Sequence, residues 1–263
     1  MKNPLILSIS ILSICGISFC AQAGQESFFG DHTDVTLGAA GEYAPRYLGS
    51  SESEFRLMPV IQLQRGAMFV DSTKGVGYDL PIVGGFYLEH SLGFSFGRSE
   101  QNNLWRDGSN NLRGMGDIKG ALNTSFSLGY QFSPQLAADV MATLPLTASQ
   151  GVAYQATVQG ILWQKNADEI DFETDILFGD HRNNMLFYGV SAEQSADSNF
   201  KQYNAAGGLY GESLILSWNH QFSKSWKTVV AVDYTYLNDK AANSPIIDQR
   251  NNVTETLEVA YSF

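Results

Sequence analysis

Polar and apolar residues alternate along most of this chain. In 168–178 the acidic residues occupy one set of alternate positions and large apolar residues most of the other: Glu169, Asp171, Glu173 and Asp175 against Ile170, Phe172, Ile176 and Phe178. A period of two places the two sets on opposite faces of a β-strand. Runs such as 118–132 exceed the roughly 5–6 residues of an average globular strand. They reach the roughly 9–11 residues that a tilted strand needs to cross a membrane.

The pattern therefore predicts an all-β protein, an antiparallel transmembrane β-barrel of about twelve strands, an even number as in single-chain bacterial barrels. Aromatic residues near the strand ends fit an interfacial girdle. The alternative is a soluble β-sandwich or a large lipocalin-like barrel, in which shorter strands are expected. The strands are predicted at 34–43, 55–64, 67–80, 85–97, 118–132, 135–146, 151–164, 168–179, 184–192, 204–222, 225–237 and 252–263.

Two of these segments leave the count open. Segment 67–80 contains Gly75 and Gly77 and can be a tight hairpin, and 204–222 is long and interrupted by glycines. Dividing both gives fourteen strands. The choice decides the side of the long segment 98–117, which lies in the periplasm with twelve strands and outside the cell with fourteen.

The first residues predict export. Lys2 precedes an apolar run, and Ala21-Gln22-Ala23 matches the small-x-small cleavage rule, so that residues 1–23 form a signal peptide and the mature barrel domain, 24–263, begins at Gly24. A transmembrane anchor is the alternative, but the run is shorter than the roughly 20 residues that a spanning helix needs. Cleavage removes both cysteines, Cys15 and Cys20, and with them disulfides and thiolate chemistry.

The composition argues against two classes of protein, nucleic-acid binders and disordered chains. Lys and Arg number 16 against 27 Asp and Glu, the net charge is −11, charged residues make up only 16% and aromatic residues 12%. This balance argues against nucleic acid as a partner, because phosphate contacts need clustered basic residues. The aromatic content is also too high for a disordered chain. Lipid of the outer membrane of a Gram-negative bacterium is the expected surrounding.

The last strand carries a second signal. Leu257, Val259, Tyr261 and Phe263 follow one another at two-residue steps, and Phe263 is the last residue. This arrangement resembles the C-terminal signature that the outer-membrane barrel-insertion machinery recognises, which makes that machinery an expected partner.

Three loop motifs occur in a fixed order. The first has Tyr43, Pro45, Tyr47, Gly49 and Ser50, the second Gly114, Gly116 and Asp117, and the third Ser244, Pro245 and Asp248. This set resembles the MltA-interacting protein family, also called OmpV-like outer-membrane proteins, over residues 34–263. The residue types also have a structural interpretation, since proline fixes φ and glycine permits tight turns.

The resemblance implies a non-enzymatic barrel that acts as a scaffold between a murein-degrading lytic transglycosylase and a murein-synthesising penicillin-binding protein. Segment 98–117 contains Trp105, Arg106 and Arg113, and aromatic and arginine residues are the usual interface anchors. Two other functions stay open. Small polar luminal residues suit a porin-like channel for small solutes, and loops 44–54 and 238–251 suit a surface adhesin or receptor.

Enzyme chemistry is not predicted. The four histidines are His32, His90, His181 and His220, and neither His90-Ser91 nor Ser217 with His220 places its two side chains on the same strand face. His-x-His or His-Glu pairing at metal-ligand spacing is also missing, so that no catalytic residue, metal or cofactor is expected.

Overall fold

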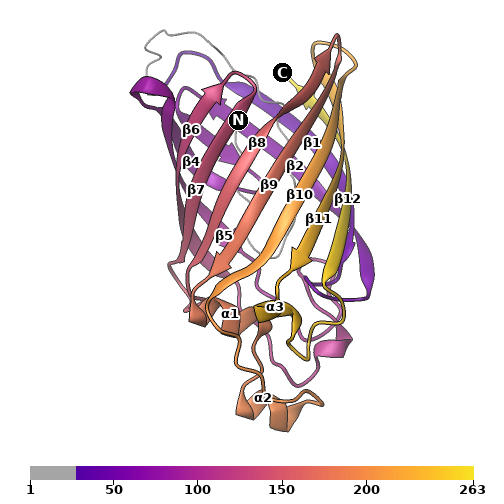
Figure 1. The fold of residues 1–263 in the computed structure, drawn as a ribbon. Coiled ribbons are helices and arrows are strands. Elements are labelled where there is room, and N and C mark those ends of the chain that lie inside the picture. The colour runs from indigo at the N-terminus through magenta and orange to yellow at the C-terminus, as the bar shows by residue number, and fades with distance from the viewer. Residues whose placement is uncertain (1–27) are drawn as a thin grey trace.

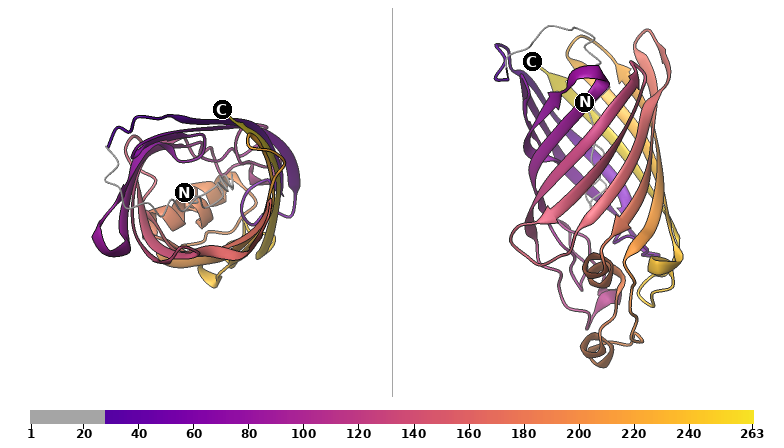
Figure 2. Two further views of the ribbon diagram at one scale, coloured as in Figure 1. Left: turned by 90° about the horizontal axis from the view of Figure 1, so that it is seen from above. Right: turned by 60° about the vertical axis from the view of Figure 1, so that its left-hand side comes forward.

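The computed structural model describes residues 28–263, which form a closed antiparallel barrel (Figures 1 and 2). Each strand pairs with its neighbours in sequence, and β1 closes the barrel by pairing with β12. The strands are β1 Asp34–Pro45, β2 Ser53–Arg65, β3 Met68–Asp71, β4 Gly75–Pro81, β5 Phe86–Ser95, β6 Ala121–Ser133, β7 Leu136–Pro145, β8 Ala153–Lys165, β9 Asp168–Gly179, β10 Gly208–Gln221, β11 Trp226–Leu237 and β12 Asn251–Ser262. The helices are α1 His181–Tyr188, α2 Ala192–Asp197, α3 Asp239–Ala242 and the 3-10 turns η1 Val83–Gly85 and η2 Asn110–Leu112.

The barrel fold and the twelve strands confirm the prediction, but two strand assignments were wrong. Segment 67–80 is the hairpin β3–β4, and 184–192 is not a strand but contains most of α1. The first error adds one strand and the second removes one, so that the predicted total of twelve is unchanged. Segment 204–222 stays one strand, β10, with a bulge between Leu209 and Gly211.

The alternating pattern fixes which face each side chain takes. On β12, Asn252, Thr254, Thr256 and Glu258 point inward and are buried, whereas the residues between them face outward. Of the predicted terminal signal, Leu257, Val259 and Phe263 are exposed to 54%, 43% and 73%. The barrel is thus polar inside and apolar outside, as a bilayer requires. No helix among residues 28–263 is long and apolar enough to cross a membrane.

The two ends of the barrel differ in their connections (Figure 1). The end with the C terminus has the short turns 66–67, 82–85, 134–135, 166–167 and 222–225. The opposite end has the long connections 46–52, 96–120, 146–152, 180–207 and 238–250. Outer-membrane barrels have short periplasmic turns and longer extracellular loops, and we therefore refer to these as the periplasmic and the external end.

One part of the wall is incomplete. β3 pairs only with Gln62–Arg65 of β2, so that the external half of β2 has a neighbour on one side alone. Ser72 donates its N–H to the Ile61 carbonyl, which shows that odd-numbered residues of β2 direct their backbone groups toward this free edge. Pro59 has no N–H and occupies one of these positions, as is typical of proline on an edge.

Candidate functional site

The long connections pack together into a loop cap, made of 46–52, 96–120, 180–207 and 238–250. Each contributes to one apolar core of almost fully buried side chains: Tyr47, Leu112, Met115, Val190 and Ile246. A second core joins α1, α3 and the external end of β10 through Phe187, Tyr188, Tyr210, Leu237 and Ala241. Seen along the barrel axis, helical segments lie across the opening (Figure 2). The cap therefore covers this end instead of leaving a wide mouth.

Local capping interactions explain why the cap contains helices. Asp180 accepts a hydrogen bond from the Asn183 N–H at 2.7 Å and begins α1. Ser191 and Gln194 form a capping box that begins α2. Gln194 Nε2 also donates to the Met115 carbonyl at 2.7 Å, which ties 180–207 to 96–120.

A buried arginine holds three of these segments together. Arg98 donates from Nη1 to the Phe187 carbonyl at 2.7 Å, and its guanidinium lies 5.6 Å from the centre of the Tyr47 ring. Burial lowers the pKa of Arg98 below its ordinary value. The charge is thus held by a carbonyl and an aromatic face.

The first and third loop motifs contact one another. The Tyr47 hydroxyl donates to the Ile246 carbonyl at 2.8 Å, and the Gly49 N–H donates to Asn252 Oδ1 at 2.7 Å. Gly49 has a φ of 101°, and a Cβ there would lie 2.4 Å from Ile247 Cδ1. The Ser51 hydroxyl donates to Asp248 at 2.9 Å. Tyr43 and Pro45 lie at the external end of β1, Ser50 and Ser244 are buried, and Pro245 lies in the connection 238–250.

The second motif is a turn around Glu100. Gly114 and Gly116, with φ of 88° and 72°, both donate their N–H to Glu100 Oε2 at 2.9 Å. Asp117 accepts from the Glu100 N–H at 3.0 Å and forms an ion pair with Arg106. Hydrogen bonding to the Glu100 N–H lowers the pKa of Asp117. In this geometry the motif residues determine the shape of the loop.

The candidate partner anchor lies in the loop cap, at the opposite end of the barrel from the C terminus. The prediction with twelve strands placed it at the end with the short turns. Segment 98–117 contacts loop 46–52, since Gly108 donates to the Arg46 carbonyl and Ser109 donates to Glu52. This difference arises because the hairpin β3–β4 was counted as a single strand. Trp105 is exposed to 80%, and Arg113 is also exposed, so that both remain accessible at this end.

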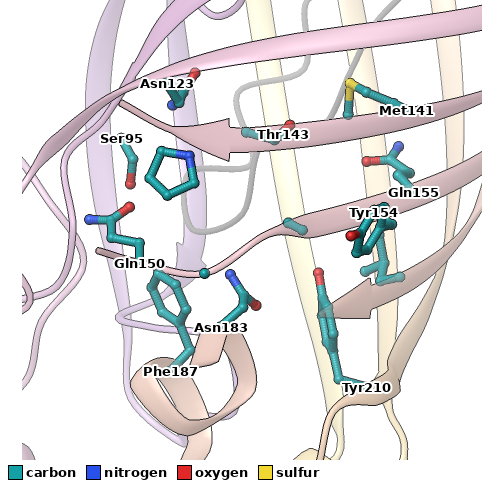
Figure 3. Close-up of a pocket in the computed structure, with 14 residues that line it drawn as sticks. Ser95, Asn123, Met141, Thr143, Gln150, Tyr154, Gln155, Asn183, Phe187 and Tyr210 are labelled. Carbon is teal, nitrogen blue, oxygen red and sulfur yellow. The ribbon is translucent and has the colours of Figure 1, made fainter. Parts of the chain in front are cut away.

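A pocket lies inside the barrel, on the side of α1 that faces the lumen (Figure 3). The ends of β6, β7 and β8 form one side, and Asn183 and Phe187 of α1 with Tyr210 of β10 form the other. The empty space is about 520 Å³, including the part that is open to solvent. None of the lining side chains is charged; they are Ser95, Asn123, Met141, Thr143, Pro145, Gln150, Gly151, Ala153, Tyr154, Gln155, Leu177, Asn183, Phe187 and Tyr210.

The sequence analysis missed this pocket and the α1 helix. The apolar residues Leu186 to Tyr188 fit a short strand as well as a helix, and periodicity cannot separate the two in so short a run. A usable signal for α1 was present in Asp180, an N-cap residue type directly before the helix. Ser191 and Gln194, with the spacing of a capping box, are the corresponding signal for α2.

The acidic side chains of β9 face the lumen as predicted. Asp175 accepts hydrogen bonds from Gln155, Thr157 and Ser213 at 2.7–2.8 Å, and Asp171 accepts one from Asn219 at 2.6 Å. Amide and hydroxyl groups, not arginine or lysine, are thus the partners recorded for these two carboxylates.

Within residues 28–263, the side-chain hydrogen-bond partners of His90 and His220 are not serines. His90 Nε2 lies 2.8 Å from Thr124 Oγ1 and its ring stacks on Phe126, while His220 Nδ1 lies 2.7 Å from Asp168 Oδ1. Among the described residues, no group of three or more His, Cys, Asp or Glu side chains could hold a metal ion.

Comparison with known proteins identifies one family. The family model for the MltA-interacting protein MipA matches residues 37–263. No curated protein sequence matches significantly. Similar solved structures are outer-membrane barrels. The NanC porin has 11% identity and a TM-score of 0.46, with 88% of this chain and 99% of that chain covered. An outer membrane channel from Pseudomonas putida F1 has 10% identity and a TM-score of 0.47, with 92% and 100% covered.

Proposed function

Because the chain belongs to the MltA-interacting protein MipA family, we propose that this outer-membrane barrel binds a lytic transglycosylase of the MltA type at its periplasmic end, with a penicillin-binding protein as a further partner in the same assembly. The family description itself names the interaction with MltA. The barrel would then hold murein-degrading and murein-synthesising enzymes close to the outer membrane, without carrying out chemistry of its own.

The observation that carries this proposal is the apolar turn between β4 and β5. Val83 is 92% exposed and Ile82 is 48% exposed, and Val83 has the highest exposure of the large apolar side chains described. The turn continues into a row of aromatic rings, in which Phe86 lies 4.8 Å from Tyr130 and Tyr130 lies 5.0 Å from Phe132. The other periplasmic turns contain mainly polar or small residues. An exposed apolar group beside aromatic residues is a typical contact surface.

Binding of the purified mature barrel in detergent to a purified lytic transglycosylase of this type tests the proposal. Val83→Asp should weaken binding at least tenfold, because it places a charge at the centre of the contact. Gln135→Asp, in the polar β6–β7 turn of the same end, is the matched control and should bind like the wild type. Equal affinity of V83D and wild type for the transglycosylase would reject this contact. If only Trp105→Ala lost transglycosylase binding, the contact would lie at the external end instead.

A surface receptor or adhesin is the second candidate. Leu104 and Trp105 are exposed to 74% and 80% beside each other on the loop cap. Attachment of cells to a host surface should fall in a Leu104→Ser/Trp105→Ser variant if this role applies, while transglycosylase binding stays unchanged. Unchanged attachment would reject it.

A further inference from the structure

The pocket on the luminal side of α1 contains polar atoms that are buried and have no partner. Asn123, Gln155 and Asn183 are each only 4% exposed, and all three line the pocket. Both polar atoms of the Asn123 amide, Gln155 Oε1 and Asn183 Oδ1 have no hydrogen-bond partner in the structure. A buried polar atom without a partner costs roughly 1–3 kcal/mol, and native proteins leave few of them. Several in one hollow indicate that a bound molecule supplies the missing partners.

We propose that this pocket binds an uncharged, hydroxyl-rich small molecule, a neutral sugar. Three of the four unpartnered atoms are amide oxygens, which accept hydrogen bonds, and one is the Asn123 amide nitrogen, which donates. Hydroxyl groups can serve both kinds of atom.

The charges around the pocket favour a neutral ligand over an anion. The lining contains no arginine or lysine that could compensate a carboxylate or phosphate. Two charged side chains contact lining residues at 2.7 Å: Asp175 accepts from the Gln155 side-chain amide, whereas Arg98 donates to the backbone carbonyl of Phe187. On the side of the Gln155 amide, the neighbouring charged group is thus acidic. The hydrogen bond to Asp175 also fixes the orientation of the Gln155 amide, so that its oxygen stays available as an acceptor.

The apolar part of the pocket fits the same class of ligand. Phe187 and Tyr210 rise from the α1 side, opposite the amide of Asn123 (Figure 3). A sugar ring has an apolar face of C–H groups and a polar rim of hydroxyls, and a site with aromatic walls and a few placed polar groups recognises both. The cap segment that carries Phe187 is held by Arg98, whose Nη1 donates to the Phe187 carbonyl. Phe187 therefore belongs both to the pocket lining and to the loop cap that covers the external end.

Saturation-transfer NMR on the mature protein in detergent tests this site. Glucose, maltose and N-acetylglucosamine are the neutral probes, and glucuronate is the anionic probe of similar size. We expect saturation transfer to at least one neutral sugar and none to glucuronate. Asn123→Leu and Asn183→Leu should each reduce the affinity for that sugar at least tenfold, since each removes hydrogen-bonding atoms at nearly constant volume.

Gln202→Leu is the matched control, because it replaces an exposed amide of the same loop cap and should bind like the wild type. Retained heat-modifiable mobility on gels shows that each variant is folded, which keeps loss of binding distinct from loss of structure. The proposal is overturned if no neutral sugar receives saturation, if glucuronate binds equally well, or if N123L and N183L bind like Q202L. The outcome is independent of transglycosylase binding at the other end.

Discussion

Arg56 on β2 donates a hydrogen bond from Nη1 to Asp107 Oδ1 in the 96–120 loop at 2.9 Å, and both side chains are buried. Arg56 also donates to Glu54 Oε1 at 2.5 Å. This pair joins the barrel wall to the loop cap, at the free edge of β2. Removing the interaction between Arg56 and Asp107 should therefore weaken the contact between the barrel wall and the loop cap. It leaves the backbone hydrogen bonds between the strands in place.

The first prediction concerns pH. Burial raises the pKa of Asp107 to about 7, and this outweighs the attraction of Arg56 and Arg98. The folded state then binds more protons than the unfolded state between the ordinary aspartate pKa of 3.8 and about 7. The contribution of Asp107 to the free energy of unfolding should therefore fall as pH rises through this window, by up to about 1.4 kcal/mol per pH unit, and should be largest below it.

Urea unfolding of the wild type and Asp107→Asn from pH 4 to pH 8 measures this effect, because all other titrating groups are shared. The difference between the two midpoints should change across the window in the stated direction. Parallel curves for the two proteins would show that Asp107 does not titrate in it.

The second prediction concerns the contact between Tyr87 and Gly129. These residues are directly paired across β5 and β6, and a Cβ on Gly129 would lie 1.8 Å from Tyr87 Cζ. The ring therefore covers the glycine, a known way of protecting glycine in barrels. Gly129→Ala should lower the free energy of unfolding by about 1–3 kcal/mol.

Double-mutant analysis supplies the control. In a Tyr87→Ala background the ring is gone, and Gly129→Ala should be nearly neutral. Additive effects of the two substitutions in denaturant unfolding would mean that the alanine does not displace the ring.

The sequence predicts features that depend on residues close together in the chain, but not those that depend on contacts between distant residues. Alternation along β12 depends only on neighbouring residues, and it correctly predicted that Glu258 faces inward and Val259 outward. Gly75, with a φ of 87°, marks the hairpin that the sequence analysis left as an alternative. The pocket depends on Asn123 of β6 meeting Asn183 of α1. A single sequence contains no periodicity that connects two such distant positions.

The third prediction uses the free edge of β2. Pro59 and Val60 stand opposite Ala39 and Gly38 of β1. The backbone groups of Pro59 point toward the free edge, whereas those of Val60 point toward β1. Pro59→Val should change the free energy of unfolding by at most about 1 kcal/mol, because no ladder hydrogen bond is involved. Val60→Pro removes a ladder donor and should cost roughly 2–3 kcal/mol. Urea midpoints of the two variants compare them, and a milder effect for V60P than for P59V would contradict the assigned edge.

The fourth prediction concerns closure of the external end. Leu112 is completely buried in the loop cap, in contact with the segments that carry Tyr47 and Ile246. Leu112→Ala should weaken the cap by about 2–4 kcal/mol through the cavity that it leaves. In planar bilayers we expect more frequent or larger conductance steps for L112A than for the wild type. Steps of equal size and frequency would mean that the cap does not control the opening.

The fifth prediction concerns orientation, on which both proposed contacts depend. The only cysteines of the sequence are Cys15 and Cys20, in the predicted signal peptide, so that a single introduced cysteine reports one position. Asn111 is exposed on the loop cap and Lys224 is exposed in the β10–β11 turn at the other end. A bulky maleimide that cannot cross the outer membrane should label Asn111→Cys on intact cells. It should label Lys224→Cys only after the outer membrane is opened. The reverse pattern would place the cap in the periplasm, and the transglycosylase contact would then be sought at Trp105 instead of Val83.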